Sequence, residues 1–326
     1  MIISRTPLRM SLVGGGSDLP AFYRRARGAV LSTAIDKYVY VNVNKKFDNG
    51  VRVAYSKNEE VNCVNDVEHQ LVRAALRHVG IDGGVEITTI ADIPSKGTGL
   101  GSSSTFTVGL LHALNAYQGR YVSAERLGAE ACTIEIDICG EPIGKQDQYA
   151  AAYGGFNLIE FLPDESVIVE PVICLPQTVA ELQRNTLLLY TGITRSASAL
   201  LKEQSAIVAT QADKHATLAQ MVRLAYELRD ELQNNRADAV GEILHENWML
   251  KKSVTAGIST PAIDSWYEAA RKAGAIGGKI LGAGAGGFLM LYAPQEQHEA
   301  ICTALPELRH VPISFEPLGS RIIFYH

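Results

Sequence analysis

The chain has 326 residues, of which 47% are hydrophobic and 20% are charged, and its formal net charge is −5. These values are typical of a globular enzyme with two domains or one large domain, and they lack the basic surplus expected of a nucleic-acid-binding protein. No run of eighteen apolar residues predicts a transmembrane helix, and the N-terminal segment lacks the apolar core of a secretion signal. We therefore expect a cytoplasmic protein with no membrane partner.

In the first half of the chain, alternating and β-branched segments predict strands over 2–13, 29–44, 51–55, 84–90, 156–162 and 167–173. Asp66 is the predicted N-cap of a helix that stops at Gly80. Ser123 is the predicted cap of a further helix, which ends at Gly140.

Two prolines within 171–177 predict a domain boundary, with one domain over 1–175 and a second over 176–326. The elements predicted after it are strands over 186–190, 279–281, 287–292 and 320–325 and helices over 195–234, 237–252 and from Thr260 to Gly274. Both halves mix strands with helices, so the predicted fold class is α+β.

Five cysteines, an odd number without a C-x-x-C pair, predict neither a disulfide framework nor a zinc site. Short basic pairs such as Lys251-Lys252 are interpreted as solvated surface positions.

The segment PSKGTGLGSSSTF, residues 94–106, is the most informative part of the sequence. Its glycines let the backbone approach a ligand closely, and its serines begin a helix whose N–H groups and dipole attract anions. A tight strand-to-helix turn capped by serines is the alternative. The candidate nucleotide-binding residues are Gly97, Gly99, Leu100, Gly101, Ser102, Ser103 and Ser104.

Two other nucleotide motifs are disfavoured. No segment fits the Walker A pattern, which requires Lys followed by Ser or Thr. Gly282, Gly284 and Gly287 match G-x-G-x-x-G, but they precede a strand near the C-terminus, where a dinucleotide-binding fold would need a helix. We interpret this second glycine-rich turn as a backbone segment that approaches either a substrate, through Gly284 and Gly286, or the first loop.

Charged residues flank these loops. Arg9 and Asp18 lie on either side of a triple glycine, and Glu135 and Asp147 are separated by the Gly140–Gly144 break. Phosphoryl transfer needs a metal-binding group and a group that positions the attacking hydroxyl. Structural ion pairs and solvated helix positions are the alternatives for each of these residues taken alone.

The three glycine-rich elements occur in the order seen in GHMP kinases, the family of galactokinase, homoserine kinase and mevalonate kinase. Pro94–Ser103 resembles the central signature, Gly282–Gly287 the C-terminal one, and Pro7–Asp18 the N-terminal one. The resemblance covers nearly the whole chain. It implies an ATP-dependent kinase with an N-terminal domain like ribosomal protein S5 domain 2 and a ferredoxin-like C-terminal domain.

The resemblance also implies roles for individual residues. Ser103 and Glu135 would coordinate Mg²⁺, Asp147 would be the catalytic aspartate, and Arg9 beside it would stabilise negative charge. The substrate-binding residues would be Arg9, Gly16, Ser17, Asp18, Lys145, Arg195, Gly284 and Gly286.

The substrate is suggested by local variants of the motifs. Gly14–Asp18 reads GGGSD where galactokinases have Gly-Glu-His-Thr-Asp, which argues against galactose. GGGSDLP, GKQDQY and YTGITRSAS resemble the heptose 7-phosphate kinase branch of the family. This implies transfer of the ATP γ-phosphoryl group to O1 of D-glycero-D-manno-heptose 7-phosphate, in the synthesis of nucleotide-activated heptose. Arg195, Lys202 and Lys145 are the candidates for binding the distal phosphate.

Two other functions remain open: a kinase of an unphosphorylated sugar such as L-fucose, and a non-catalytic sugar or ATP sensor with the same fold. The expected partners are ATP and a sugar phosphate, and a homodimer is compatible with the sequence.

Overall fold

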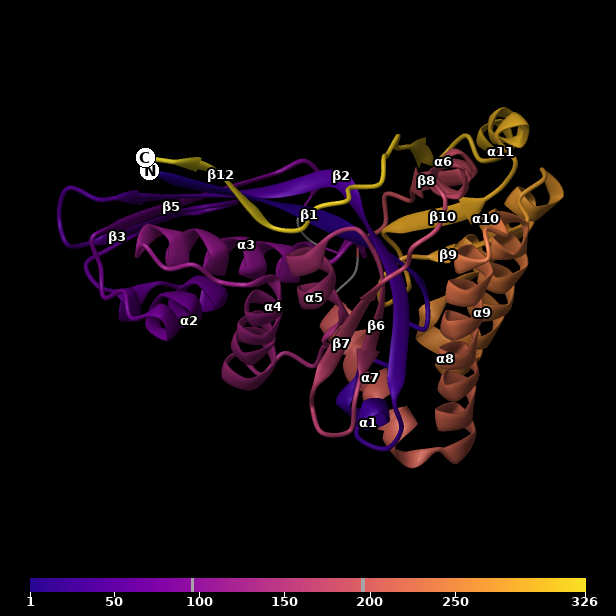
Figure 1. The fold of residues 1–326 in the computed structure, drawn as a ribbon, viewed down its shortest axis with the longest axis horizontal. Coiled ribbons are helices and arrows are strands. Elements are labelled where there is room, and N and C mark those ends of the chain that lie inside the picture. The colour runs from indigo at the N-terminus through magenta and orange to yellow at the C-terminus, as the bar shows by residue number, and fades with distance from the viewer. Residues whose placement is uncertain (95–96, 195–196) are drawn as a thin grey trace.

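The computed structural model describes residues 1–94, 97–194 and 197–326 and contains two β-sheets (Figure 1). The larger sheet has eight strands in the order β12-β1-β2-β5-β3-β4, with β6 paired to β2 and β7 paired to β6. Its strands are β1 (Ile2–Val13), β2 (Gly28–Lys45), β3 (Val51–Ala54), β4 (Asn58–Val61), β5 (Val85–Ala91), β6 (Phe156–Phe161), β7 (Val167–Pro171) and β12 (Arg321–Tyr325).

The longer helices of the first half lie along one face of this sheet, whereas the short α1 (Pro20–Tyr23) contacts α7 (Ala197–Thr210) of the second half (Figure 1). The central one, α3, packs against β1 and β2 and is buried along most of its length, because its sequence is apolar on nearly every side. The helices are α1 (Pro20–Tyr23), α2 (Gln70–Val79), α3 (Ser102–Tyr117), α4 (Ala124–Cys132), which continues as a π-helix (Thr133–Ile138), and α5 (Gln146–Tyr153).

The smaller sheet is antiparallel, with the order β11-β8-β10-β9. Its strands are β8 (Thr186–Tyr190), β9 (Gly277–Ile280), β10 (Phe288–Tyr292) and β11 (Arg309–His310). In chain order this is the 4-1-3-2 arrangement of a ferredoxin-like β-α-β-β-α-β unit, as expected. The helices of this half are α6 (Pro176–Arg184), α7 (Ala197–Thr210), α8 (Ala212–Gln233), α9 (Val240–Val254), α10 (Pro261–Lys272) and α11 (His298–Ala304).

The two ends of the chain meet in the larger sheet. β12 pairs antiparallel with β1, and the N–H of His326 donates to the carbonyl of Met1 at 3.1 Å (Figure 1). The first sheet therefore includes a strand from beyond the predicted boundary, and the division at residue 175 stays a prediction.

Several predicted helix ends agree with the structure. Ser123 and Thr260 accept hydrogen bonds from the N–H groups of Arg126 and Ile263, and Gly80 ends α2 with a left-handed φ of 75°. The predicted N-cap at Asp66 is wrong.

Residues 64–66 instead form a short 3-10 turn, and α2 begins only at Gln70. The carboxylate of Glu59 causes this delay, because it accepts the N–H groups of Glu68 and His69 just before the helix. In the described part of the chain, no helix is long and apolar enough to cross a bilayer.

Candidate functional site

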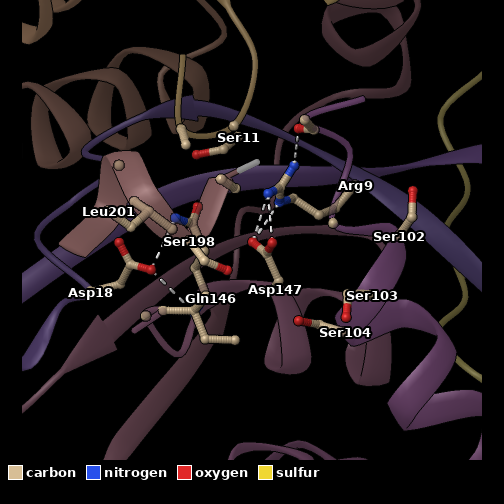
Figure 2. A pocket seen from close by; sticks show the side chains of 18 of the residues that line it. Arg9, Ser11, Asp18, Ser102, Ser103, Ser104, Gln146, Asp147, Ser198 and Leu201 are labelled. Atoms are coloured by element: carbon tan, nitrogen blue, oxygen red, sulfur yellow. Dashed lines mark hydrogen bonds and ion pairs between the residues drawn. The ribbon is translucent and has the colours of Figure 1, made fainter. Parts of the chain in front are cut away.

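A cavity of about 630 Å³ is lined by residues from both halves of the chain. The lining comes from β1 and the loop after it, the N-terminus of α3, the segment before α5, the start of α7, α9 and the second glycine-rich turn. Figure 2 shows Ser102–Ser104 at one side of this cavity, Asp147 near its middle and Asp18 at the opposite side. The volume suits small molecules of the size of a nucleotide or a sugar.

The N-terminus of α3 opens into the cavity. Gly101 is its N-cap residue, with a left-handed φ of 76°, and no side chain caps this end of the helix. A Cβ on Gly101 would lie 3.2 Å from Oδ2 of Asp147, so a larger residue would crowd that carboxylate. The first N–H groups of the helix are thus available to an anion, with the dipole adding attraction.

Arg9 holds Asp147 in a bidentate ion pair. Its Nε donates to Oδ1 and its Nη2 to Oδ2, each at 2.8 Å, while Nη1 donates to the carbonyl of Gly99 at 2.7 Å. The Arg9 side chain is only 3% exposed, whereas that of Asp147 is 24% exposed. The carboxylate therefore has a fixed orientation and keeps lone pairs open to the cavity.

Glu135 lies in the π-helix that follows α4, and such π segments often occur at functional sites. Its Oε1 accepts from the hydroxyls of Ser103 at 3.2 Å and Thr107 at 3.1 Å, and its Oε2 accepts from Gln148 at 2.6 Å. Burial raises the pKa of Glu135 to about 7, although the hydrogen bonds oppose this shift.

Ser103 and Glu135 together offer oxygen ligands beside the helix N-terminus. Mg²⁺ prefers oxygen donors and commonly uses one or two carboxylates together with substrate phosphates and water. Among the described residues, no group of three or more His, Cys, Asp or Glu side chains forms a metal site. A carboxylate beside a hydroxyl suits a magnesium ion that is shared with a phosphate ligand.

Asp18 occupies the opposite part of the cavity and is 3% exposed. Its Oδ1 accepts the N–H of Gly16 at 2.9 Å and its Oδ2 accepts Nε2 of Gln146 at 3.0 Å. Burial raises the pKa of this carboxyl above its ordinary value, and the nearby Asp147 raises it further. A carboxylate in this setting can accept the hydroxyls of a polar ligand.

The two glycine-rich loops touch each other. A Cβ on Gly282 would lie 2.6 Å from Cα of Gly99, and one on Gly99 would lie 2.9 Å from the carbonyl carbon of Leu281. Only glycine allows backbones to pack this closely. The second turn thus packs against the first loop, and through Gly282 and Ala283 it also lines the cavity.

Comparison with known proteins identifies the family. Residues 66–155 match the model for the N-terminal domain of GHMP kinases, and residues 228–309 match the model for their C-terminal domain. The two matches together span more than half of the chain. The chain belongs to the GHMP kinase family. It is a sugar kinase, a phosphotransferase with an alcohol acceptor and ATP as donor.

Individual relatives of this GHMP kinase are similar over almost its full length. D-glycero-alpha-D-manno-heptose 7-phosphate kinase of Campylobacter jejuni is 29% identical and covers 92% of each chain. A crystal structure named as a D-glycero-D-manno-heptose 1-phosphate kinase of Bacteroides thetaiotaomicron superposes over the whole of both chains, with a TM-score of 0.83 and 27% identity. L-fucokinase/L-fucose-1-P guanylyltransferase of Bacteroides fragilis is 26% identical over 91% of this chain and 35% of its own.

Most predicted site residues of this kinase line the cavity. They are Arg9, Gly16, Asp18, Gly97, Gly99, Gly101, Ser102, Ser103, Ser104, Glu135 and Asp147. Their individual roles stay predictions. Arg195, predicted to bind the distal phosphate, lies outside the described residues.

Leu100 and Ser17 do not line the cavity. Leu100 is fully buried, and its carbonyl accepts the N–H of Arg9, so it anchors the loop to β1. Ser17 is also fully buried, and its hydroxyl exchanges hydrogen bonds with the backbone of Ala29. Both residues are packed behind the cavity wall, and their predicted ligand contacts stay predictions.

Lys145 is also placed differently from the prediction. Its Nζ forms an ion pair with Glu165 at 2.6 Å and lies 4.9 Å from the ring centroid of Tyr23. Lys202 is exposed and does not line the cavity either.

Gly284 and Gly286 lie against other loops. Added Cβ atoms there would meet the backbone of Ile258 and Ile193 at 2.7 and 2.6 Å. These two glycines therefore serve loop packing, and their predicted substrate contact has no support in the geometry.

The predicted site residues did not include several others that line the cavity, among them Ser11, Gly144, Gln146, Leu201 and Lys251, and Ser198 was expected only as a hydroxyl donor beside Arg195. Two of them had a usable signal, since Gln146 and Ser198 fall inside the motifs GKQDQY and YTGITRSAS. The interpretation of Lys251 as solvated is wrong, because the residue is 4% exposed. It shares one face of α9 with the buried Asn247 and Trp248.

Proposed function

We propose that this kinase transfers the γ-phosphoryl group of ATP, with Mg²⁺, to O1 of D-glycero-D-manno-heptose 7-phosphate, giving the 1,7-bisphosphate. The observation that carries the chemistry is the carboxylate of Asp147, held by Arg9 beside the uncapped N-terminus of α3. A terminal phosphate at that helix end would lie next to a group able to position an attacking hydroxyl.

Asp147 accepts the proton of the sugar hydroxyl or orients that hydroxyl toward the phosphorus. Arg9 fixes the carboxylate through two parallel hydrogen bonds and contributes positive charge where negative charge develops. Because Arg9 also bonds Gly99, it links the orientation of Asp147 to the phosphate-binding loop.

Ser103 and Glu135 hold the magnesium ion. When bound, Mg²⁺ neutralises charge on the transferring phosphates. Thr107 and Gln148 fix the Glu135 carboxylate from behind, which presents it to the cavity in one orientation.

Asp18 and Gln146 bind hydroxyls of the sugar at the other side of Asp147. The choice of a heptose phosphate rests on the Campylobacter relative and on the Bacteroides structure, whose names place the phosphate at different positions of the sugar.

The test is a panel of heptose 7-phosphate, heptose 1-phosphate, free heptose and L-fucose, each supplied with ATP and Mg²⁺. We expect kcat/KM to be highest for heptose 7-phosphate, with ³¹P NMR showing a new phosphate on O1. If kcat/KM were highest for L-fucose or for heptose 1-phosphate, that sugar would be the substrate in place of heptose 7-phosphate. ATP turnover no faster than the background rate with every sugar would favour a sensor.

A further inference from the structure

Lys251 is a buried cation at the Asp18 side of the cavity. It lines the cavity although it is only 4% exposed. Its Nζ donates to the carbonyl of Gly15 at 3.0 Å and to Oε1 of Gln204 at 3.1 Å. An ammonium group has three N–H donors, so these two bonds leave one unused.

The hydrogen bonds of Lys251 reach only neutral oxygens, and the same holds for its buried neighbour Lys279, whose Nζ donates to the carbonyl of Ser11 at 2.9 Å. Burial lowers the pKa of Lys251 to about 8 and that of Lys279 to about 7, with Asp18 opposing both shifts. A buried ammonium without a paired anion is costly, so an anionic ligand would be attracted to this place.

Unpaired polar atoms surround Lys251. Nε2 of Gln204 and Oγ of Ser11 are buried and have no hydrogen-bond partner among the described residues. Gln204 is fully buried and lies with Lys251 against Gly16, where an added Cβ would be 3.1 Å from the lysine Nζ. Native proteins rarely leave such donors unsatisfied, and because Ser11 lines the cavity whereas Gln204 does not, it is the Ser11 hydroxyl that indicates a polar ligand.

Two other described cations near the cavity, Arg9 and Lys145, are already engaged, and Lys279 does not line the cavity. Arg9 is held by Asp147 and Gly99, and Lys145 is paired with Glu165 away from the cavity. Among the residues that the structure describes, Lys251 is therefore the cation that lines the cavity and keeps an N–H group without an acceptor.

We propose that Lys251, held in position by Gly15 and Gln204, binds the phosphate group that the sugar substrate already carries before the transfer. This assignment rests on the proposed function, because it requires a phosphorylated sugar. The geometry agrees with it: Lys251 contacts the loop that carries Asp18, and Asp147 separates Asp18 from the N-terminus of α3 (Figure 2). The incoming sugar would thus have its reacting hydroxyl at Asp147 and its existing phosphate at Lys251.

The experiment measures KM and kcat for heptose 7-phosphate and for free heptose with three variants. Lys251→Met removes the charge while keeping an unbranched side chain. Gln204→Glu keeps the lysine but places a carboxylate beside it. Lys252→Met is the matched control, because Lys252 pairs with Asp264 and does not line the cavity.

We expect both site variants to raise KM for the 7-phosphate by roughly 10- to 100-fold, the range for a hydrogen bond to a charged group, with KM for free heptose changed less than about threefold. The control should match wild type with both sugars. Equal losses for both sugars would mean that Lys251 merely supports the glycine loop, and that would overturn the assignment.

The proposed function and this assignment can fail separately. If wild type uses free heptose as well as the 7-phosphate, the proposed function is wrong and the assignment falls with it. If wild type prefers the 7-phosphate and both site variants keep that preference, only the role of Lys251 is refuted. A further variant, Arg195→Ala, tests the residue first predicted to bind the distal phosphate. If this variant loses the preference for the 7-phosphate and the Lys251 and Gln204 variants keep it, only the role of Lys251 is refuted.

Discussion

Gly144 offers a sharp test of the Asp18 subsite. A Cβ at this position would lie 2.5 Å from Cγ of Asp18 and 2.9 Å from its backbone oxygen. Carbon atoms in contact normally lie about 3.5–4.0 Å apart, so Gly144→Ala requires the carboxyl group to retreat by about 1 Å. Asp18 is 3% exposed, and the open side to which its carboxyl group can move is the cavity that it lines.

The retreat breaks at least one of the hydrogen bonds that Asp18 accepts from Gly16 and Gln146. Hydrogen bonds to charged groups are worth about 1.5–3 kcal/mol, and a displacement of 1 Å can cost about 10²-fold in rate. We therefore expect kcat/KM for the sugar to fall about 10²-fold in Gly144→Ala. KM for ATP should stay within about twofold of wild type, because the substitution is on the sugar side.

Initial rates with sugar and ATP varied separately measure both constants. Gly140→Ala is the control, since it lies in the same segment and its Cβ would meet nothing within 4 Å. Its left-handed φ of 70° makes it strained by about 1–2 kcal/mol, so it reports on general loop perturbation. An unchanged kcat/KM in a folded Gly144→Ala enzyme, or an equal loss in Gly140→Ala, would refute the reasoning.

Three more outcomes are expected. Asp147→Asn should lower kcat by about 10²-fold or more and leave ATP binding intact in a fluorescence titration; near-normal kcat would remove Asp147 from the chemistry. Glu135→Ala should raise the Mg²⁺ concentration needed for half-maximal rate, and unchanged dependence would remove it from the metal site. Because burial lowers the pKa of Lys279 to about 7, the unfolded chain binds a proton that the folded chain lacks between about pH 7 and 10.5, so stability rises with pH there. In denaturant titrations, Lys279→Met should flatten this rise, which is at most about 1.4 kcal/mol per pH unit. If the free energy of unfolding of the variant and of wild type changed with pH in parallel, the lowered pKa of Lys279 would be contradicted.

Local sequence signals correctly predicted helix ends that depend only on neighbouring residues. Ser123 and Thr260 cap their helices as expected, because one hydroxyl and one N–H suffice for a cap. The prediction failed at Asp66, because Glu59 on the preceding strand β4 accepts hydrogen bonds from the N–H groups of the two residues before α2. Capping by a distant side chain has no signature in a local window.

Some elements were missed for a related reason. α5 carries Asp147 in its first turn, yet its residues from Gln148 to Ala152 are all buried. A short helix that is covered on every side shows no polar face, so its sequence lacks the periodicity that identifies amphipathic helices.

The site residues likewise divide into those that sequence motifs identify and those that only the folded structure reveals. Arg9 and Ser103 lie within glycine-rich signatures, and the family resemblance added Glu135 and Asp147, so the sequence predicted four residues that line one cavity. Lys251 could not be found like this, since a Lys-Lys pair on a helix usually faces water. Its burial depends on α9 packing against the loop at Gly15, which lies 236 residues earlier in the chain.

The distribution of charge explains why both halves of the chain are needed. The first half supplies the anion-binding helix end and the carboxylates Asp18, Glu135 and Asp147, whereas Lys251 and Lys279 come from the second half. Each lysine donates to a backbone carbonyl of the segment from Ser11 to Gly15, so the second half holds that segment in place while bringing two lysine amines to it. ATP together with a phosphorylated sugar fits this arrangement better than ATP with a neutral sugar does, because the terminal phosphate of ATP would face α3 and the phosphate of the sugar would face Lys251.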